Sequence, residues 1–112
     1  MDFRFITFIS LTLLCCTNTA FAQTVEGSET LVNTSTTGVQ QRPNIASDTS
    51  GAFVIVWESA GTDGDGYGVY AQRYNSSGLA QGGEFLVNTT TSDDQRFPAI
   101  AMDYDGDFVV VW

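Results

Sequence analysis

Acidic residues near the carboxyl end of the chain are the first candidates for chemistry. Asp103, Asp105 and Asp107 alternate in the stretch AMDYDGDFVVVW, with Gly106 among them. Calcium takes about six to eight oxygen ligands, commonly carboxylates at alternate positions beside a glycine that permits a sharp turn. Two interpretations follow, a calcium loop and a tight turn that leads into a buried strand.

A second acidic candidate lies in the stretch GTDGDGYG. Asp63 and Asp65 stand there among four glycines. These residues fit a flexible, solvated connection, and they also fit a calcium or ligand loop held on the rim of a rigid scaffold. Calcium is thus the only cofactor that the sequence suggests, with these two aspartates and the three near the carboxyl end as its candidate ligands.

The start of the chain has the layout of a secretory signal peptide. Arg4 precedes an apolar stretch over 5–16, and the small-residue exit AFA ends at Ala22, after which we expect cleavage. The apolar stretch has about a dozen residues, whereas a bilayer span needs roughly 20. We therefore expect a chain that is secreted or held at the cell surface, without a transmembrane span after cleavage.

Cleavage would also remove both cysteines, Cys15 and Cys16. The mature chain could then form no disulfide, no thiolate nucleophile and no cysteine-ligated metal site.

The charge of the chain limits its partners. Thirteen acidic residues stand against four arginines, without lysine or histidine, and the formal net charge is −9 at pH 7. Such a surface disfavours nucleic acid and anionic lipid, because both are bound through basic residues. Cations, glycans and other surface proteins remain as candidate partners. The lack of histidine excludes a Ser-His-Asp hydrolytic triad within the chain.

An internal repeat is the strongest signal in the sequence. Residues 30–57 align with 85–112 without a gap at a spacing of 55, and 15 of the 28 positions are identical. Self-similarity at a fixed period is typical of repeat architectures. It divides the chain into a signal peptide over 1–22, an N-terminal segment over 23–29, a first unit over 30–84 and a truncated second unit over 85–112.

Each unit is expected to contribute four short antiparallel strands. Short runs rich in β-branched and aromatic residues alternate with turn residues and predict strands over 44–48, 52–58, 69–74 and 84–89. In the second of these, AFVIVW, successive side chains point to opposite faces, and both faces are apolar. A strand of this kind belongs to a sheet that is covered on both sides.

The predicted fold class is therefore all-β, with antiparallel four-stranded blade repeats that resemble a β-propeller. One full blade and half of a second are present. A β-sandwich whose halves share a repeat stays open as an alternative. Because propellers close with about four to eight blades, we expect either the N-terminal part of a longer protein or a short product that must oligomerise.

The repeat also bears on the turn at 103–107. The equivalent turn in the first unit reads DTSGA, which keeps the first aspartate and the glycine as Asp48 and Gly51 and lacks the other two carboxylates. An aspartate that caps a turn and a glycine with positive φ explain the shared residues without an ion. This comparison favours the turn over the calcium loop.

The pattern P-x-I-A-x-D-x-x-G-x-F-V-x-V-W, followed by GVYAQRYNSSG and EFLVNT, resembles blades of sialidase-type propellers. It is still more similar to the tandem repeats of large exported bacterial proteins. The resemblance covers essentially the whole mature segment and implies a propeller. The Asp-box of sialidase-type blades, S-x-D-x-G-x-x-W, is absent from the corresponding stretch NSSGLAQGGEF. Arg42, Arg73 and Arg96 cannot be matched to the arginine triad of a sialidase site. No catalytic residue is carried over.

Two functions follow from these observations. The first is an exported, non-enzymatic repeat scaffold for binding, adhesion or surface structure. The second is the N-terminal part of a sialidase-like propeller glycoside hydrolase, whose site residues would lie partly downstream. Tyr67, Tyr70 and Tyr74 could form an aromatic platform for a glycan, or they could pack across strands.

Overall fold

The computed structural model describes residues 3–6, 9–10, 24–25 and 27–112. These residues form strands without a helix: β1 (Arg4–Ile6), β2 (Ile9–Ser10), β3 (Thr24–Val25), β4 (Glu29–Leu31), β5 (Gln40–Ser47), β6 (Phe53–Ala60), β7 (Tyr67–Tyr74), β8 (Phe85–Leu86), β9 (Ala99–Met102) and β10 (Phe108–Val111). The expected cleavage site after Ala22 and the two cysteines lie outside the described residues. Over the described ranges, no helix is long and apolar enough to cross a membrane.

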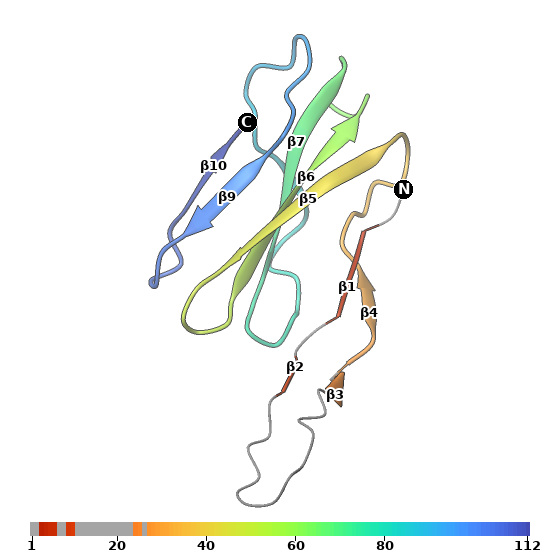
Figure 1. Cartoon of the computed structure of the whole chain (residues 1–112). Helices are drawn as coiled ribbons and strands as arrows, with labels where there is room; N and C mark the ends of the chain where they lie inside the picture. The colour runs from red at the N-terminus through yellow and green to blue at the C-terminus, as the bar shows by residue number, and fades with distance from the viewer. Residues whose placement is uncertain (1–2, 7–8, 11–23, 26) are drawn as a thin grey trace, which may run out of the picture.

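The centre of the fold is a four-stranded antiparallel sheet in the order β5-β6-β7-β8 (Figure 1). These are the four strands predicted for the first unit. The strand β5 begins earlier than expected, at Gln40, and contains an irregularity between Gln41 and Asn44. The strand β8 is only two residues long. The all-β class and the four-stranded antiparallel sheet are confirmed, and over the described ranges the strands form no closed ring.

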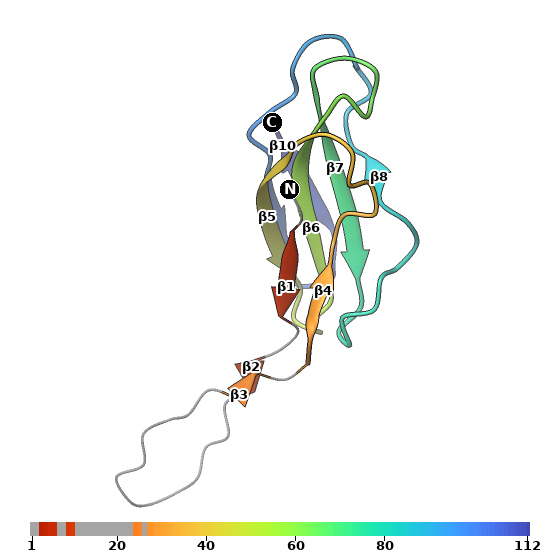
Figure 2. The same cartoon turned by 90° about the vertical axis from the view of Figure 1, so that its right-hand side faces the viewer.

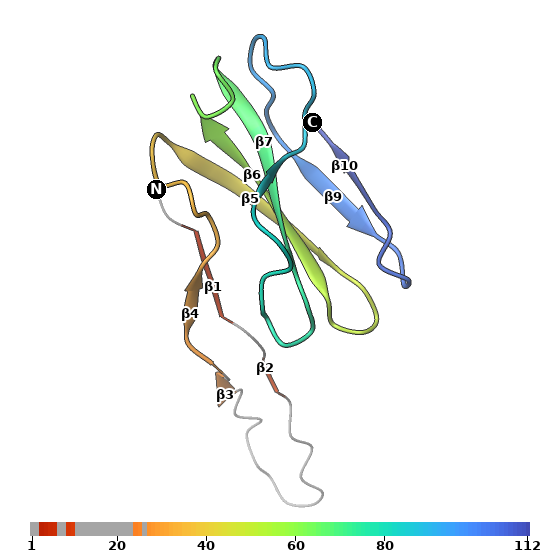
Figure 3. The same cartoon turned by 180° about the vertical axis from the view of Figure 1, so that it is seen from behind.

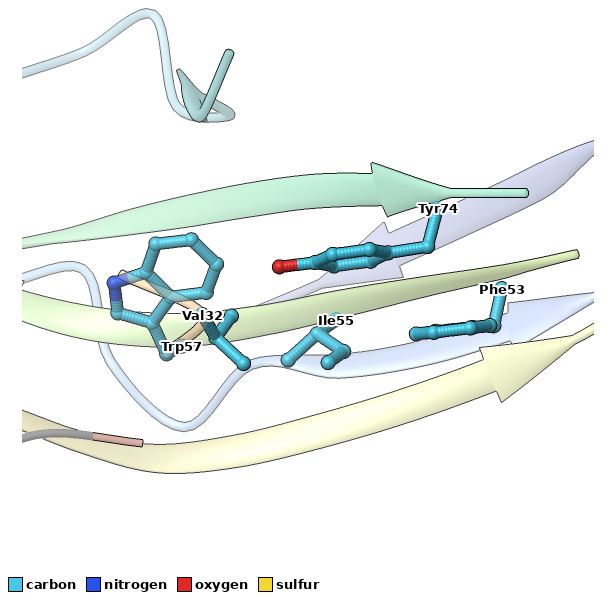
Figure 4. Packing of buried hydrophobic residues seen from close by; sticks show 5 residues of the cluster. All are labelled: Val32, Phe53, Ile55, Trp57 and Tyr74. Atoms are coloured by element: carbon cyan, nitrogen blue, oxygen red, sulfur yellow. The ribbon is translucent and has the colours of Figure 1, made fainter. Parts of the chain in front are cut away.

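Strand β6 is buried along nearly its whole length, from Phe53 to Ser59. Phe53, Ile55 and Trp57 join a cluster with Val32 and Tyr74 on one face of the sheet, and Figure 4 shows the three in a row along the strand. Its even-numbered valines join a second cluster on the other face. The sequence expectation of a strand apolar on both faces is therefore matched by burial on both faces.

Two small sheets cover the two faces of the central sheet. The pair β1-β4 lies on one side and the pair β9-β10 on the other, as Figure 1 and Figure 3 show from opposite directions. Figure 2 looks onto the face of the central sheet, with β1-β4 in front and β10 behind. The strand β9 packs against β5. The β-branched runs of the two repeat units thus stack as layers, which removes from water the apolar surface that each would otherwise expose.

The sequence repeat and the sheet are offset by one strand. Strands β4, β5 and β6 of the first unit recur 55 residues later as β8, β9 and β10. The strand β8 begins the second repeat in the sequence but completes the sheet of the first, since Tyr70 lies opposite Leu86 and Ala71 opposite Phe85. The sequence boundary between 84 and 85 therefore falls within a single sheet.

Strand β1 takes the same place beside β4 that β7 takes beside β8. Arg4 lies opposite Leu31, and Leu31 is the equivalent of Leu86, which lies opposite Tyr70. The pair β1-β4 thus reproduces the second half of a four-stranded sheet. Its strand β1 comes from the segment expected to be the signal peptide.

The layered core predicts a difference between two equivalent valines. Val56 is fully buried, whereas Val111, its equivalent in the second unit, is 58% exposed. We expect Val56→Ala to lower the free energy of unfolding by about 2 kcal/mol, through lost burial and the cavity left behind. The matched control Val111→Ala should change it by less than about 0.5 kcal/mol.

Urea unfolding followed by circular dichroism measures both effects. Equal costs for the two substitutions would contradict the layered arrangement.

Candidate functional site

The carboxylate of Glu58 lies at the centre of the contact between the two repeat units. Glu58 follows Trp57 in β6 and is fully buried. Its first-unit partners are Nε2 of Gln41 at 3.0 Å and Nε of Arg42 at 3.4 Å. Its second-unit partners are Nε of Arg96 at 3.4 Å and the backbone N–H of Phe97 at 2.5 Å. We call these five residues the Glu58 junction.

Burial of a carboxylate requires that its charge be compensated. In the junction this is done by one arginine from each unit, so neither unit alone supplies the full set of partners. The side chains of Arg42 and Arg96 both stay partly in contact with water, whereas that of Glu58 is fully buried. The ion pairs are therefore partly solvated at one end and fully desolvated at the other.

The arginines of the junction also stack on aromatic rings. The guanidinium carbon of Arg42 lies 4.3 Å from the ring centre of Phe97, and that of Arg96 lies 4.1 Å from the ring centre of Tyr67. Such stacking adds a favourable cation–π interaction. Residues 42 and 97 are equivalent in the repeat, and both have positive φ, 54° and 62°. Each unit thus adopts the same unusual backbone at the residue that meets its neighbour.

A buried amide network lies beside the junction. Gln40 accepts a hydrogen bond from Nε1 of Trp57 and donates to Oγ of Ser59 and to a backbone carbonyl three residues earlier. Gln95, its repeat equivalent, donates to the carbonyl three residues before it and accepts from Nδ2 of Asn88. Both side chains are buried and satisfied, so these glutamines act as structural elements of the repeat.

The turn predicted around Asp48 is present and is held by its first residue. Oδ1 of Asp48 accepts hydrogen bonds from the backbone N–H groups of Ser50 and Ala52 and from the hydroxyl of Ser50. The Ser50 hydroxyl, together with backbone N–H groups, holds the pKa of Asp48 below its usual range. Gly51 has a φ of 88°, a conformation that a glycine adopts without strain.

The turn around Asp103 repeats this arrangement. Its Oδ1 accepts from the backbone N–H groups of Asp105 and Asp107, each at 3.0 Å, and Gly106 has a φ of 93°. In both turns the backbone N–H of the first aspartate donates to the carbonyl four residues later. The turn-capping role expected of the first aspartate is therefore observed in both units, and a calcium role for the three aspartates stays a prediction.

The loop that carries Asp63 and Asp65 is tied to the second repeat. Oδ2 of Asp63 accepts from Nδ2 of Asn88 at 3.2 Å, and Oδ2 of Asp65 accepts from the backbone N–H of Asp93 at 3.2 Å. A side chain at Gly68 would collide with the Asp63 carboxylate, so the glycine leaves room for it. Across the described ranges, no group of three or more His, Cys, Asp or Glu side chains could hold a metal ion.

The three tyrosines of β7 do not share one surface. Tyr70 stacks near Trp57, with ring centres 6.4 Å apart, and Tyr74 stacks on Phe53, with ring centres 4.8 Å apart. Tyr67 lies on the opposite face of the strand, beneath a guanidinium of the junction. Their observed contacts are those of packing across strands.

Sequence reasoning missed the role of Glu58. The available signal is a carboxylate that directly follows the apolar run ending in Trp57, where a buried strand would otherwise continue. Its partners Arg42 and Arg96 occupy positions that are not equivalent in the repeat, so the alignment does not pair them.

Comparisons of the chain with protein-family models, with curated proteins and with solved structures give no match.

The junction predicts that removal of the buried Glu58 carboxylate destabilises the fold more than removal of an exposed carboxylate. We expect Glu58→Ala to lower the free energy of unfolding by about 2–3 kcal/mol, because two arginines and the N–H of Phe97 lose this buried carboxylate. The control Glu29→Ala removes a carboxylate whose side chain is 62% exposed and should cost less than about 0.5 kcal/mol. Thermal or urea unfolding measures both, and a cost at Glu58 no greater than at Glu29 would refute the role of the junction.

The hydrogen bonds of the acidic loops predict the outcome of a calcium titration. The aspartates that begin the two turns and the two in the Gly-rich loop each accept hydrogen bonds through one carboxylate oxygen. Over the described ranges, Oδ1 of Asp63 is buried without a partner, but a single free oxygen falls far short of the about six that calcium takes, and no three acidic side chains are grouped to hold a metal. We therefore expect isothermal titration of the purified chain with calcium to give no saturable heat. A saturable heat that Asp63→Asn or Asp65→Asn removes would instead identify a calcium site in that loop.

Proposed function

We propose that the protein is an exported, non-enzymatic repeat scaffold that serves binding, adhesion or surface structure. The observation that supports this most is the contact between the repeat units, which is built as a structural joint. It combines an apolar interface, in which Val54 and Val56 are 3% and 0% exposed, with the fully buried carboxylate of Glu58. Such a joint makes successive units rigid with respect to one another, as a scaffold requires.

Three buried side chains, Glu58, Gln40 and Gln95, support the same proposal, because their hydrogen bonds are made within the fold; among the residues that the structure describes, Oδ1 of Asp63 is buried without a hydrogen-bond partner. Glu58 is engaged by four partners, and Gln40 and Gln95 bind backbone carbonyls and neighbouring side chains. A catalytic acid or nucleophile needs a free atom directed at a substrate. These groups are instead directed at one another and at the next unit.

The exposed loops are the surfaces that such a scaffold offers to a partner. Asp65, Asp93 and Asp94 are exposed on two adjoining loops at one rim. In a chain of net charge −9, these carboxylates favour a cationic partner. Loops on a rigid scaffold are where binding residues concentrate.

Rigid coupling of the units is testable with the two tryptophans, which are repeat equivalents. Incorporation of 5-fluorotryptophan places one ¹⁹F probe in each unit, at Trp57 and Trp112, without a substitution. We expect both signals to shift from folded to unfolded at the same urea concentration, because the joint makes the units unfold together.

Two results would contradict the scaffold. Separate midpoints for Trp57 and Trp112 would show that the units are independent. Turnover of a sialoside or another fluorogenic glycoside by the purified chain would show that it is an enzyme. Single-probe variants Trp57→Phe and Trp112→Phe assign the two signals.

A further inference from the structure

The contact between the units joins two different faces of the same kind of hairpin. The second unit contributes Ile100 and Val110, which lie opposite each other on β9 and β10. The first unit contributes Val54 and Val56 of β6. We call the face of a hairpin that carries Ile100 and Val110, or their equivalents, its front face. The face that carries Val54 and Val56, or their equivalents, is its back face. The internal contact is thus front face on back face.

Repeat equivalence assigns the same two faces to the other hairpins. The front face of the first unit carries Ile45 and Ile55, which also lie opposite each other. The back face of the second unit carries Val109 and Val111. The chain therefore has one front face and one back face that the internal contact does not use.

Exposure differs between these equivalent faces in the way that a missing neighbour would produce. On the back faces, Val54 and Val56 are buried by β9 and β10, whereas Val109 and Val111 are 59% and 58% exposed. On the front faces, Pro98 is buried and Ile100 is half-buried. Their first-unit equivalents are Pro43 and Ile45, and both are exposed, Ile45 at 56%.

A second observation shows what kind of structure the front face of the first unit accepts. The backbone carbonyl of Phe3 accepts from the N–H of Val32, and its N–H donates to Oδ1 of Asn33. In the first sheet, the backbone of Val69 makes the same two hydrogen bonds with Val87 and with Asn88.

The pair β1-β4 therefore imitates β7 and β8, and it is seated on the first-unit front face. Val32 packs there with Ile55 and Trp57, and in the internal contact Val87 and Val110 both pack against a single buried cluster.

This imitation covers only half of the front face. The counterparts of β5 and β6 are missing over Ile45. A cavity of about 390 Å³ lies there between the first unit and the N-terminal strand, bordered by Phe3, Arg4, Val32, Pro43, Asn44, Ile45 and Ile55. A hairpin whose back face is equivalent to that of β5-β6 would complete the cover. Within the chain, the unused hairpin of that kind is β9-β10.

We propose that a second copy of this chain docks head to tail, with the back face of its β9-β10 hairpin on the front face of the first unit. Val109 and Val111 of one copy then lie against Ile45 and Ile55 of the next, as a continuation of the internal contact. The proposal rests on the proposed scaffold function and names its partner. Because the two faces differ, the contact is heterologous and generates a ring or a filament.

Analytical ultracentrifugation of the purified chain with residues 1–22 retained, over a wide concentration range, tests the docking. We expect reversible association that Ile45→Glu and Val109→Glu each weaken at least about tenfold, since each buries a charge against valine or isoleucine. The control Leu79→Glu changes an apolar residue that is 63% exposed in the turn after β7, and it should leave association unchanged. Circular dichroism confirms that each variant is folded.

A mixture of the two variants gives the sharpest result. Ile45→Glu retains an intact back face and Val109→Glu retains an intact front face, so the mixture should form one-to-one dimers that grow no further.

Three results would overturn the proposal: a monomer at every concentration, an equal loss with Leu79→Glu, or loss with Val109→Glu but not with Ile45→Glu. The last would indicate a two-fold contact between back faces. A monomer whose two tryptophans still unfold together would leave the scaffold standing and refute only the docking of copies.

Discussion

Burial of β6 on both faces is the constraint from which the rest of the structure follows. A strand with phenylalanine, isoleucine and tryptophan on one side and valines on the other cannot leave either side in water without a large cost. Each side is covered by a different layer, the β1-β4 pair and the β9-β10 pair. Strand β6 therefore requires a layer on each side of its sheet. Strand β10, its repeat equivalent, has the same requirement.

Apolar stacking alone does not determine how the layers are aligned. Valine and isoleucine surfaces attract one another without direction, so two such sheets could slide or rotate at little cost. The Glu58 junction removes this freedom, because the carboxylate must meet both the N–H of Phe97 and the guanidinium of Arg96. One buried charge thus aligns the second unit on the first, while the apolar faces supply most of the attraction.

The parts of the fold that were predictable are those in which a short stretch carries its own signal. The two-sided apolar run predicted β6, and the shared aspartate and glycine predicted both turns. The last strand of the sheet was expected over 84–89 but ends at Leu86. There the side chain of Asn88 takes the N–H of Val69 that a continuing strand would have bonded through its backbone.

Other features depend on partners that no local pattern identifies. The irregularity at Arg42 places its guanidinium on Phe97, and this contact joins two residues with unlike side chains. The partners of Glu58 come from two other stretches of the chain, 41–42 and 96–97. The pairing of β1 with β4 was also unexpected, because β1 comes from an apolar segment whose composition indicates export rather than a strand.

The offset between the repeat and the sheet has a consequence for how such a protein can change its length in evolution. Since β4 and β8 hold equivalent places, as do β6 and β10, unequal recombination between any two equivalent positions inserts or deletes one whole period. Wherever the crossover falls, every strand that it joins meets the neighbour that its hydrogen bonds require. Units can be gained or lost without a precise breakpoint, so the number of units is free to drift while each sheet stays intact.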